Sequence, residues 1–121
     1  MSFDDILKDL VRGVDGSVAA TLMGMDGFAV QQYKREAMDC DIDAIGVEYG
    51  HLVAEIKKAE GTLSLGDAEE VFVKGAQSGV LLRIVSDEYY IAFLLGASAN
   101  LGRARYMIKK ASRRAESELK A

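Results

Sequence analysis

Residues 41–60, DIDAIGVEYGHLVAEIKKAE, are the stretch on which the predicted fold depends. Apolar side chains recur there at the three- and four-residue spacing of a single helical face: Ile42, Ile45, Tyr49, Leu52, Val53 and Ile56. Asp41 and Asp43 open the stretch and Lys58 lies near its end, an order that complements the helix dipole. The pattern predicts an amphipathic helix that ends at Gly61.

The same helix carries a second stripe, made of small residues. Gly46, Gly50 and Ala54 stand four residues apart, beside the apolar stripe. A glycine inside a helix costs about 1 kcal/mol relative to alanine. Either the two glycines are simply tolerated, or they allow the backbone of a partner helix to approach closely. The second interpretation predicts a helix packed against its own sheet on one side and against a partner on the other.

The length and composition fit one domain that spans residues 1–121. The single cysteine, Cys40, excludes an internal disulfide and is typical of a reducing compartment. The start of the chain, MSFDDILKDL, is acidic and amphipathic, which resembles neither a signal peptide nor a transit peptide. No apolar run reaches the length of a membrane span. We therefore expect a cytoplasmic protein with no membrane span.

Hydrophobic periodicity predicts the elements on either side of this helix. An amphipathic helix covers residues 3–14, and the turn Asp26-Gly27 joins a strand at 17–25 to a strand at 28–33. Further strands are predicted at 69–75, 80–86 and 89–95, followed by a helix capped by Asn100. The order α-β-β-α-β-β-β-α predicts an α+β domain with a single five-stranded antiparallel sheet and helices on both faces.

The two most apolar strands, 17–25 and 89–95, are expected at the centre of the sheet. The strand at 69–75 is short and charged at its ends, which favours an edge position. An exposed edge presents unpaired N–H and C=O groups to a second copy of the chain. The expected dimer edge comprises Glu70, Val71, Phe72, Val73 and Lys74.

As an ordered pattern, these features resemble the Roadblock family, within a profilin-like outline, and in particular its bacterial MglB-type regulators of Ras-like GTPases. The resemblance lies in the hairpin VAATLMGMDGFAV, the helix with Gly46 and Gly50, the strand YYIAFLL and the helix start NLGRARYMIKKA. It implies homodimers joined through the third strands and the middle helices. It also implies that the paired middle helices form a platform for a small GTPase, whose own catalytic groups are repositioned so that GTP hydrolysis accelerates.

Our first hypothesis is accordingly a non-catalytic, homodimeric regulator of a Ras-like small GTPase. The candidate residues of the dimer seam and the GTPase platform lie on the middle helix: Gly46, Val47, Gly50, His51, Ala54 and Lys58. A second hypothesis is a scaffold or adaptor subunit that has no effect on GTP hydrolysis, as the resemblance implies for other branches of the family.

No motif in the chain predicts chemistry of its own. His51 is the single histidine, Cys40 lacks a CxxC partner, and neither GxxxxGK[ST] nor GxGxxG occurs. Lys34 and Arg35 precede the middle helix, where an arginine finger is conceivable, but the resemblance does not require one. We expect no enzyme activity, no cofactor and no metal site.

The last helix combines an apolar stripe with a basic side. From Asn100 onward the chain has seven Lys or Arg and two Glu. A solvated helix face, a protein-docking face and a nucleic-acid or membrane patch remain alternatives, and we expect no nucleic-acid partner because aromatic residues do not alternate with the cations. The basic side comprises Arg103, Arg105, Lys109, Lys110, Arg113 and Arg114.

Overall fold

The computed structural model describes residues 2–35 and 40–120. Three helices and five strands follow one another in the predicted order: α1 (Phe3–Arg12), β1 (Ser17–Gly24), β2 (Ala29–Lys34), α2 (Ile42–Leu63), β3 (Glu70–Lys74), β4 (Ser78–Ile84), β5 (Tyr89–Gly96) and α3 (Leu101–Lys120). Every strand begins and ends within two residues of its predicted bounds. The predicted α+β fold is confirmed.

The strands form one antiparallel sheet in the order β2-β1-β5-β4-β3. β5 lies at the centre with β1 and β4 beside it, so the two most apolar strands are central, as predicted. β2 and β3 are the edges, which confirms the edge position predicted for the strand with charged ends.

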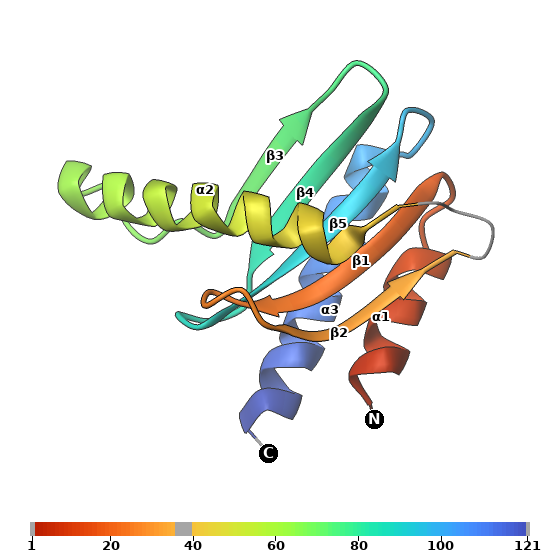
Figure 1. Ribbon diagram of the computed structural model, residues 1–121, viewed down its shortest axis with the longest axis horizontal. Coiled ribbons are helices and arrows are strands. Elements are labelled where there is room, and N and C mark those ends of the chain that lie inside the picture. Colours follow the sequence, from red (N-terminus) through yellow and green to blue (C-terminus); the bar gives the residue numbers. More distant parts are fainter. Residues whose placement is uncertain (1, 36–39, 121) are drawn as a thin grey trace.

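Helices cover both faces of the sheet (Figure 1). Because side chains alternate along a strand, Ile91 and Phe93 of β5 point to the face covered by α1 and α3. Tyr90 and Ala92 point to the opposite face, where α2 lies. The predicted placement of helices on both faces is confirmed. Along the described residues, no helix is long and apolar enough to cross a membrane.

Arg35 fastens the end of β2 to the start of the chain. Its Nε donates to the carbonyl of Ser17 at 2.6 Å, and its Nη2 donates to the carbonyls of Val11 at 2.8 Å and Val14 at 3.1 Å. These carbonyls belong to the end of α1, the turn that follows it and the start of β1. The guanidinium is therefore occupied within the subunit.

The middle helix ends later than its sequence predicts. Asp41 caps its start by accepting the N–H of Ala44 at 3.0 Å. The helix then continues through Gly61, and Ser64 takes the left-handed conformation that ends it, with φ 57°. The predicted end at Gly61 is wrong because a polar residue can adopt this conformation in place of glycine. Asp39, which the sequence places before the helix, lies outside the described residues.

Candidate protein–protein interface

The buried side of α2 carries both glycines. Gly46 and Gly50 lie on the buried side together with Ile42 and Val53. A Cβ atom added at Gly50 would clash with the hydroxyl oxygen of Tyr90, and one at Gly46 would lie 2.9 Å from Cε of Met23. The expectation that these glycines open the helix to a partner's backbone is therefore wrong. They make room for side chains of the subunit's own sheet.

Tyr90 fixes α2 over the centre of the sheet. Its hydroxyl donates a hydrogen bond to the carbonyl of Gly46. The side chain is 1% exposed, and desolvation by burial raises the pKa of Tyr90 to about 12. The phenol therefore stays protonated and keeps its donor at neutral pH. This bond holds α2 beside β1 and β5 and away from the β3 edge.

Successive residues of an α-helix are rotated by about 100° about its axis. The buried side of α2 therefore has one flank on each side of it. One flank is apolar, and its Ile45 and Tyr49 pack against the buried cluster on this face of the sheet. Its members are half-buried or exposed: Ile45, Tyr49, Leu52 and Ile56. Only Ile42 and Val53 of the predicted apolar stripe are fully buried.

The other flank of α2 faces the turn between β1 and β2. Val47 and His51 line a small depression there together with Met25 and Asp26. Val47 is half-buried, and the remaining members are exposed: His51, Ala54 and Lys58. The structure thus brings four of the predicted interface residues together on one flank, and places Gly46 and Gly50 on the neighbouring buried side.

The second half of α2 makes little contact with the rest of the subunit. Residues 54–63 are helical and none of them is buried. Leu63 is 64% exposed, and Leu65, just beyond the helix, is 67% exposed. Figure 1 shows this half of α2 extending away from the sheet. Helices in proteins depend on packing of an apolar face for stability, so this half is suited to contact with another chain.

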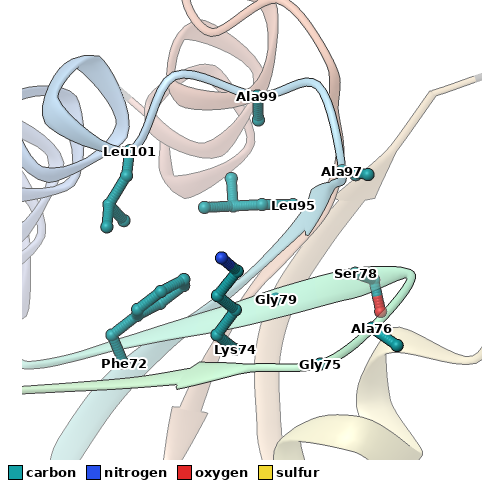
Figure 2. A pocket seen from close by; sticks show the side chains of 11 residues that line it. Phe72, Lys74, Gly75, Ala76, Ser78, Gly79, Leu95, Ala97, Ala99 and Leu101 are labelled. Atoms are coloured by element: carbon teal, nitrogen blue, oxygen red, sulfur yellow. The ribbon is translucent and has the colours of Figure 1, made fainter.

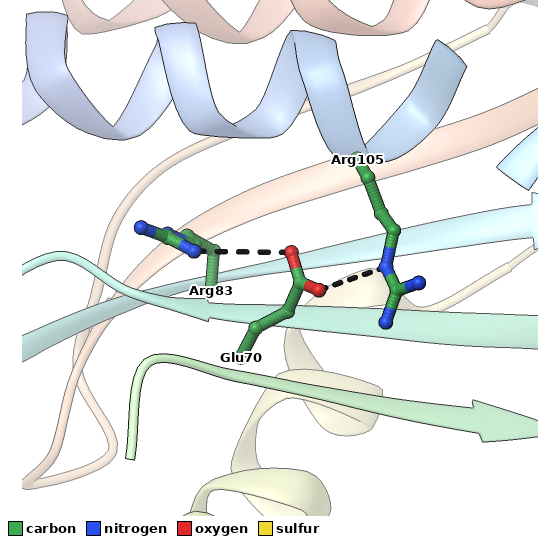
Figure 3. A network of polar contacts seen from close by, with 3 residues as sticks. All are labelled: Glu70, Arg83 and Arg105. Carbon is green, nitrogen blue, oxygen red and sulfur yellow. Dashed lines mark hydrogen bonds and ion pairs between the residues drawn. The ribbon is translucent and has the colours of Figure 1, made fainter. Parts of the chain in front are cut away.

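The β3 edge is apolar in its middle and charged at both ends. Val71, Phe72 and Val73 are half-buried, and Lys74 is exposed. The carboxylate of Glu70 lies 2.8 Å from Nε of Arg105 on α3. It also lies 3.9 Å from Nη1 of Arg83 on β4. Figure 3 shows Glu70 held between the two guanidiniums.

An open pocket of about 250 Å³ lies beside the β3 edge, on the face covered by α3. Figure 2 shows the ammonium of Lys74 directed into it, between Phe72, Leu95 and Leu101. Apart from Lys74 and Ser78, every lining residue is apolar or glycine. The lining contains no carboxylate or imidazole that can act as a general acid or base.

Three cations on the basic side of α3 are engaged within the subunit. Arg103 donates to the carbonyl of Gly13 at 3.0 Å, Arg105 pairs with Glu70, and Arg114 pairs with Asp9 at 3.1 Å. These contacts use half of the six predicted basic residues for packing α3 against α1 and β3. No local sequence pattern indicates these contacts, because the partners lie 35 to 105 residues apart in the chain.

The candidate chemical residues are dispersed. His51 is exposed on α2, and Cys40 is a half-buried free thiol before the helix. Among the described residues, no group of three or more His, Cys, Asp or Glu is placed to hold a metal ion. The candidate surfaces for association are the β3 edge and the two flanks of α2.

Comparisons with solved structures show the class of this domain. MglC from Myxococcus xanthus is 30% identical, with a TM-score of 0.70 over 98% of this chain and 99% of that chain. A Roadblock/LC7 domain from Streptomyces avermitilis is 19% identical, with a TM-score of 0.87 over 98% of each chain. MglB from Myxococcus xanthus is 16% identical, with a TM-score of 0.87 over 98% of this chain and 94% of that chain.

These structures share one α+β architecture with the present chain, that of the Roadblock/LC7 domain. The chain belongs to the Roadblock family, and its similarity extends to the MglB and MglC proteins. No family model matches the sequence, and no curated protein matches it either.

Proposed function

We propose that this chain is a non-catalytic regulator that forms a homodimer, binds a Ras-like small GTPase through its paired α2 helices and accelerates GTP hydrolysis. The observation that carries the proposal is the position of α2. Its first half is anchored to the sheet by Tyr90, while one flank and the second half contain no buried residue beyond Val53. Membership of the Roadblock family and the likeness to MglB support a partner of this class.

The dimer in this proposal forms at the β3 edge, around a two-fold axis perpendicular to the sheet. Such an axis keeps both α2 helices on the same face of a continuous sheet. The half of α2 that extends away from its own sheet then lies over the second copy. The apolar flank with Ile45, Tyr49, Leu52 and Ile56 faces the seam. A solved MglB structure with a tetrameric arrangement supports self-association in relatives of this chain.

The opposite flank of each α2 faces away from the seam and forms the GTPase platform. It combines the small apolar residues Val47 and Ala54 with the polar residues His51 and Lys58. Ala54 is exposed and has a short side chain, so a partner can approach the helix closely there. This division assigns the seam to one flank of α2 and the GTPase to the other.

Ala54→Glu tests the platform, and Ala59→Glu makes the same change on the seam flank. Ala59 is also exposed and also on α2, and helical geometry places it beside Leu52 and Ile56. The immobilised protein is incubated with extract of its native cells, and the captured small GTPase is identified and purified. We expect Ala54→Glu to weaken its binding at least 10-fold without changing the mass of the dimer, whereas Ala59→Glu should weaken the dimer itself.

The hydrolysis rate of the purified GTPase then decides between regulation and scaffolding. A rise in GTP turnover on addition of the wild-type dimer supports the proposal. Firm binding with unchanged turnover favours the adaptor alternative. Failure to capture any small GTPase contradicts both the partner and the activity proposed.

A further inference from the structure

The hydrogen-bonding groups of β3 point in alternating directions, and the contacts with β4 determine which are free. The carbonyl of Glu69 accepts the N–H of Ile84 at 3.0 Å, and the N–H of Gly75 donates to Ser78 at 2.7 Å. Odd-numbered residues of this segment therefore direct their N–H and C=O groups toward β4. Glu70, Phe72 and Lys74 direct theirs outward, to the open edge of the sheet.

A two-fold axis perpendicular to the sheet limits how a second β3 can pair. Residues directly opposite each other in an antiparallel pair have side chains on the same face. Even-numbered residues must therefore face even-numbered residues, which leaves registers centred on Glu70, Val71, Phe72, Val73 or Lys74. Centring on Phe72 pairs all five residues of the strand and satisfies the outward N–H and C=O groups of all three outward-facing residues. The other registers leave some of these groups unpaired.

We propose that β3 pairs with β3 of a second copy in the register centred on Phe72, and that the charges of Glu70 and Lys74 select this partner. The inference rests on the homodimer of the proposed function and specifies its seam. In this register Glu70 faces Lys74 of the second copy, and the reciprocal pair forms on the other side of the axis. The strand sequence EVFVK is self-complementary in charge only when it is paired in this way.

The two faces of the sheet agree with this register. On the face covered by α3, the two Phe72 rings meet at the axis between the Glu70–Lys74 pairs. Glu70 is held in place there by Arg83 and Arg105, while Lys74 is exposed at the opposite end of the strand. On the face covered by α2, Val71 faces Val73 of the second copy and extends the apolar surface beneath the α2 seam. Opposite charges directly across an antiparallel pair stabilise it, whereas like charges destabilise it.

Disulfide trapping in a Cys40→Ser background measures the register. Phe72→Cys places two thiols opposite each other, with Cα atoms about 5.5 Å apart, which a disulfide can bridge. We expect rapid formation of a covalent dimer on mild oxidation. Val71→Cys and Val73→Cys should each remain monomeric in denaturing gels, because each faces the other position, and a mixture of the two should form the covalent dimer. Self-linkage of Val71→Cys or Val73→Cys would place the axis elsewhere and overturn the inference.

A charge exchange provides a second test that leaves Phe72 in place. Glu70→Lys alone places like charges opposite each other in a homodimer, and so does Lys74→Glu alone. We expect each variant to dimerise at least 10-fold more weakly than the wild type, and an equimolar mixture to associate again as a heterodimer with both pairs restored. Glu69→Lys is the control, since it makes the same charge change just before β3 and faces no charge in this register.

Analytical ultracentrifugation distinguishes failure of the homodimer from failure of the proposed register. A wild-type monomer at micromolar concentration would contradict the homodimer of the proposed function. A stable dimer that shows neither the Phe72→Cys linkage nor recovery in the charge-exchanged mixture would leave the homodimer standing and eliminate this register. Circular dichroism of each variant confirms that the subunit is folded.

Discussion

The two edges of the sheet are built in different ways. At the β2 edge, α1 packs beside the strand, Arg12 donates to the hydroxyl of Tyr33 at 3.1 Å, and Arg35 binds three carbonyls of the α1–β1 segment. At the β3 edge, α3 contributes the pair between Arg105 and Glu70. One edge is held by its own chain, and the other presents an apolar strand with outward hydrogen-bonding groups.

The difference is the one expected of a domain that suppresses association at one edge and permits it at the other. The second half of β2 carries Gln31, Gln32 and Lys34, and polar or charged residues discourage further pairing at an edge. β3 carries Val71, Phe72 and Val73 between two opposite charges. Such a strand is suited to a partner with the complementary pattern.

Lys74→Pro tests whether the β3 edge is the one that associates, and we expect the largest effect from it. Proline is tolerated on an edge strand where the missing N–H faces outward, so the subunit should stay folded. Two hydrogen bonds across the axis are lost, and each leaves a carbonyl unpaired, which weakens the dimer roughly 100-fold or more. Sedimentation equilibrium measures the dissociation constant.

Gln32→Pro on the opposite edge is the matched control for Lys74→Pro. The N–H of Gln32 bonds to its neighbour's side chain at 3.0 Å and so is not part of the β1 ladder. We expect this variant to dimerise as the wild type does. Equal loss of dimer in both variants would show that the two edges do not differ in function.

Arg35→Gln tests how firmly the chain closes the β2 edge. The substitution removes the donors that serve Val11, Val14 and Ser17, and we expect the free energy of unfolding to fall by about 2 kcal/mol. Urea unfolding in the Lys74→Pro background gives this value without a contribution from association. Lys34→Gln, at an exposed neighbouring position, should change it by less than about 0.5 kcal/mol.

The sequence was informative wherever a pattern is local. The apolar runs identified β1 and β5 as central, and the charged ends of β3 identified an edge. Three- and four-residue spacing places Val47, His51, Ala54 and Lys58 on one flank of α2. Each of these features repeats within a few residues, so periodicity is sufficient to find it.

The periodicity of the sequence does not determine the rotation of α2 about its axis. A broad apolar stripe is compatible with several orientations, and the choice depends on Tyr90, which lies 44 residues from the Gly46 carbonyl that it binds. One of the two interpretations of the sequence therefore assigned the glycines to a partner, whereas they make room for side chains of the subunit's own sheet. The grouping of Glu70 with Arg83 and Arg105 escaped prediction for the same reason, since only the completed sheet and α3 bring these residues together.

Tyr90→Phe tests whether α2 is anchored at the centre of the sheet, away from the β3 edge. Loss of the bond to the Gly46 carbonyl should lower the free energy of unfolding by about 1 kcal/mol at pH 8. The folded-state pKa of about 12 lies above the ordinary value of 10.0. The protonated phenol thus stabilises the fold fully below pH 10, and this contribution is lost as pH rises through about 12.

The wild type should therefore lose stability relative to Tyr90→Phe between pH 10 and 12, measured by urea unfolding at several pH values. Tyr106→Phe, at an exposed position on α3, should follow the wild type. Parallel pH curves for the wild type and Tyr90→Phe would show that burial of this phenol does not hold α2 in place.

Arg105→Gln has the smallest expected effect. It removes the main ion pair between α3 and the β3 edge, and so measures how strongly α3 holds that edge. Arg105 is 54% exposed and Glu70 is 20% exposed, so solvent screens their attraction. A double-mutant cycle with Glu70→Gln in the Lys74→Pro background should give a coupling free energy of about 0.5 kcal/mol. Lys109→Gln, one turn further along α3, is the control and should show no coupling to Glu70. A coupling of about 2 kcal/mol would instead mean that α3 holds β3 as firmly as Arg35 holds β2, and the contrast between a closed and an open edge would no longer stand.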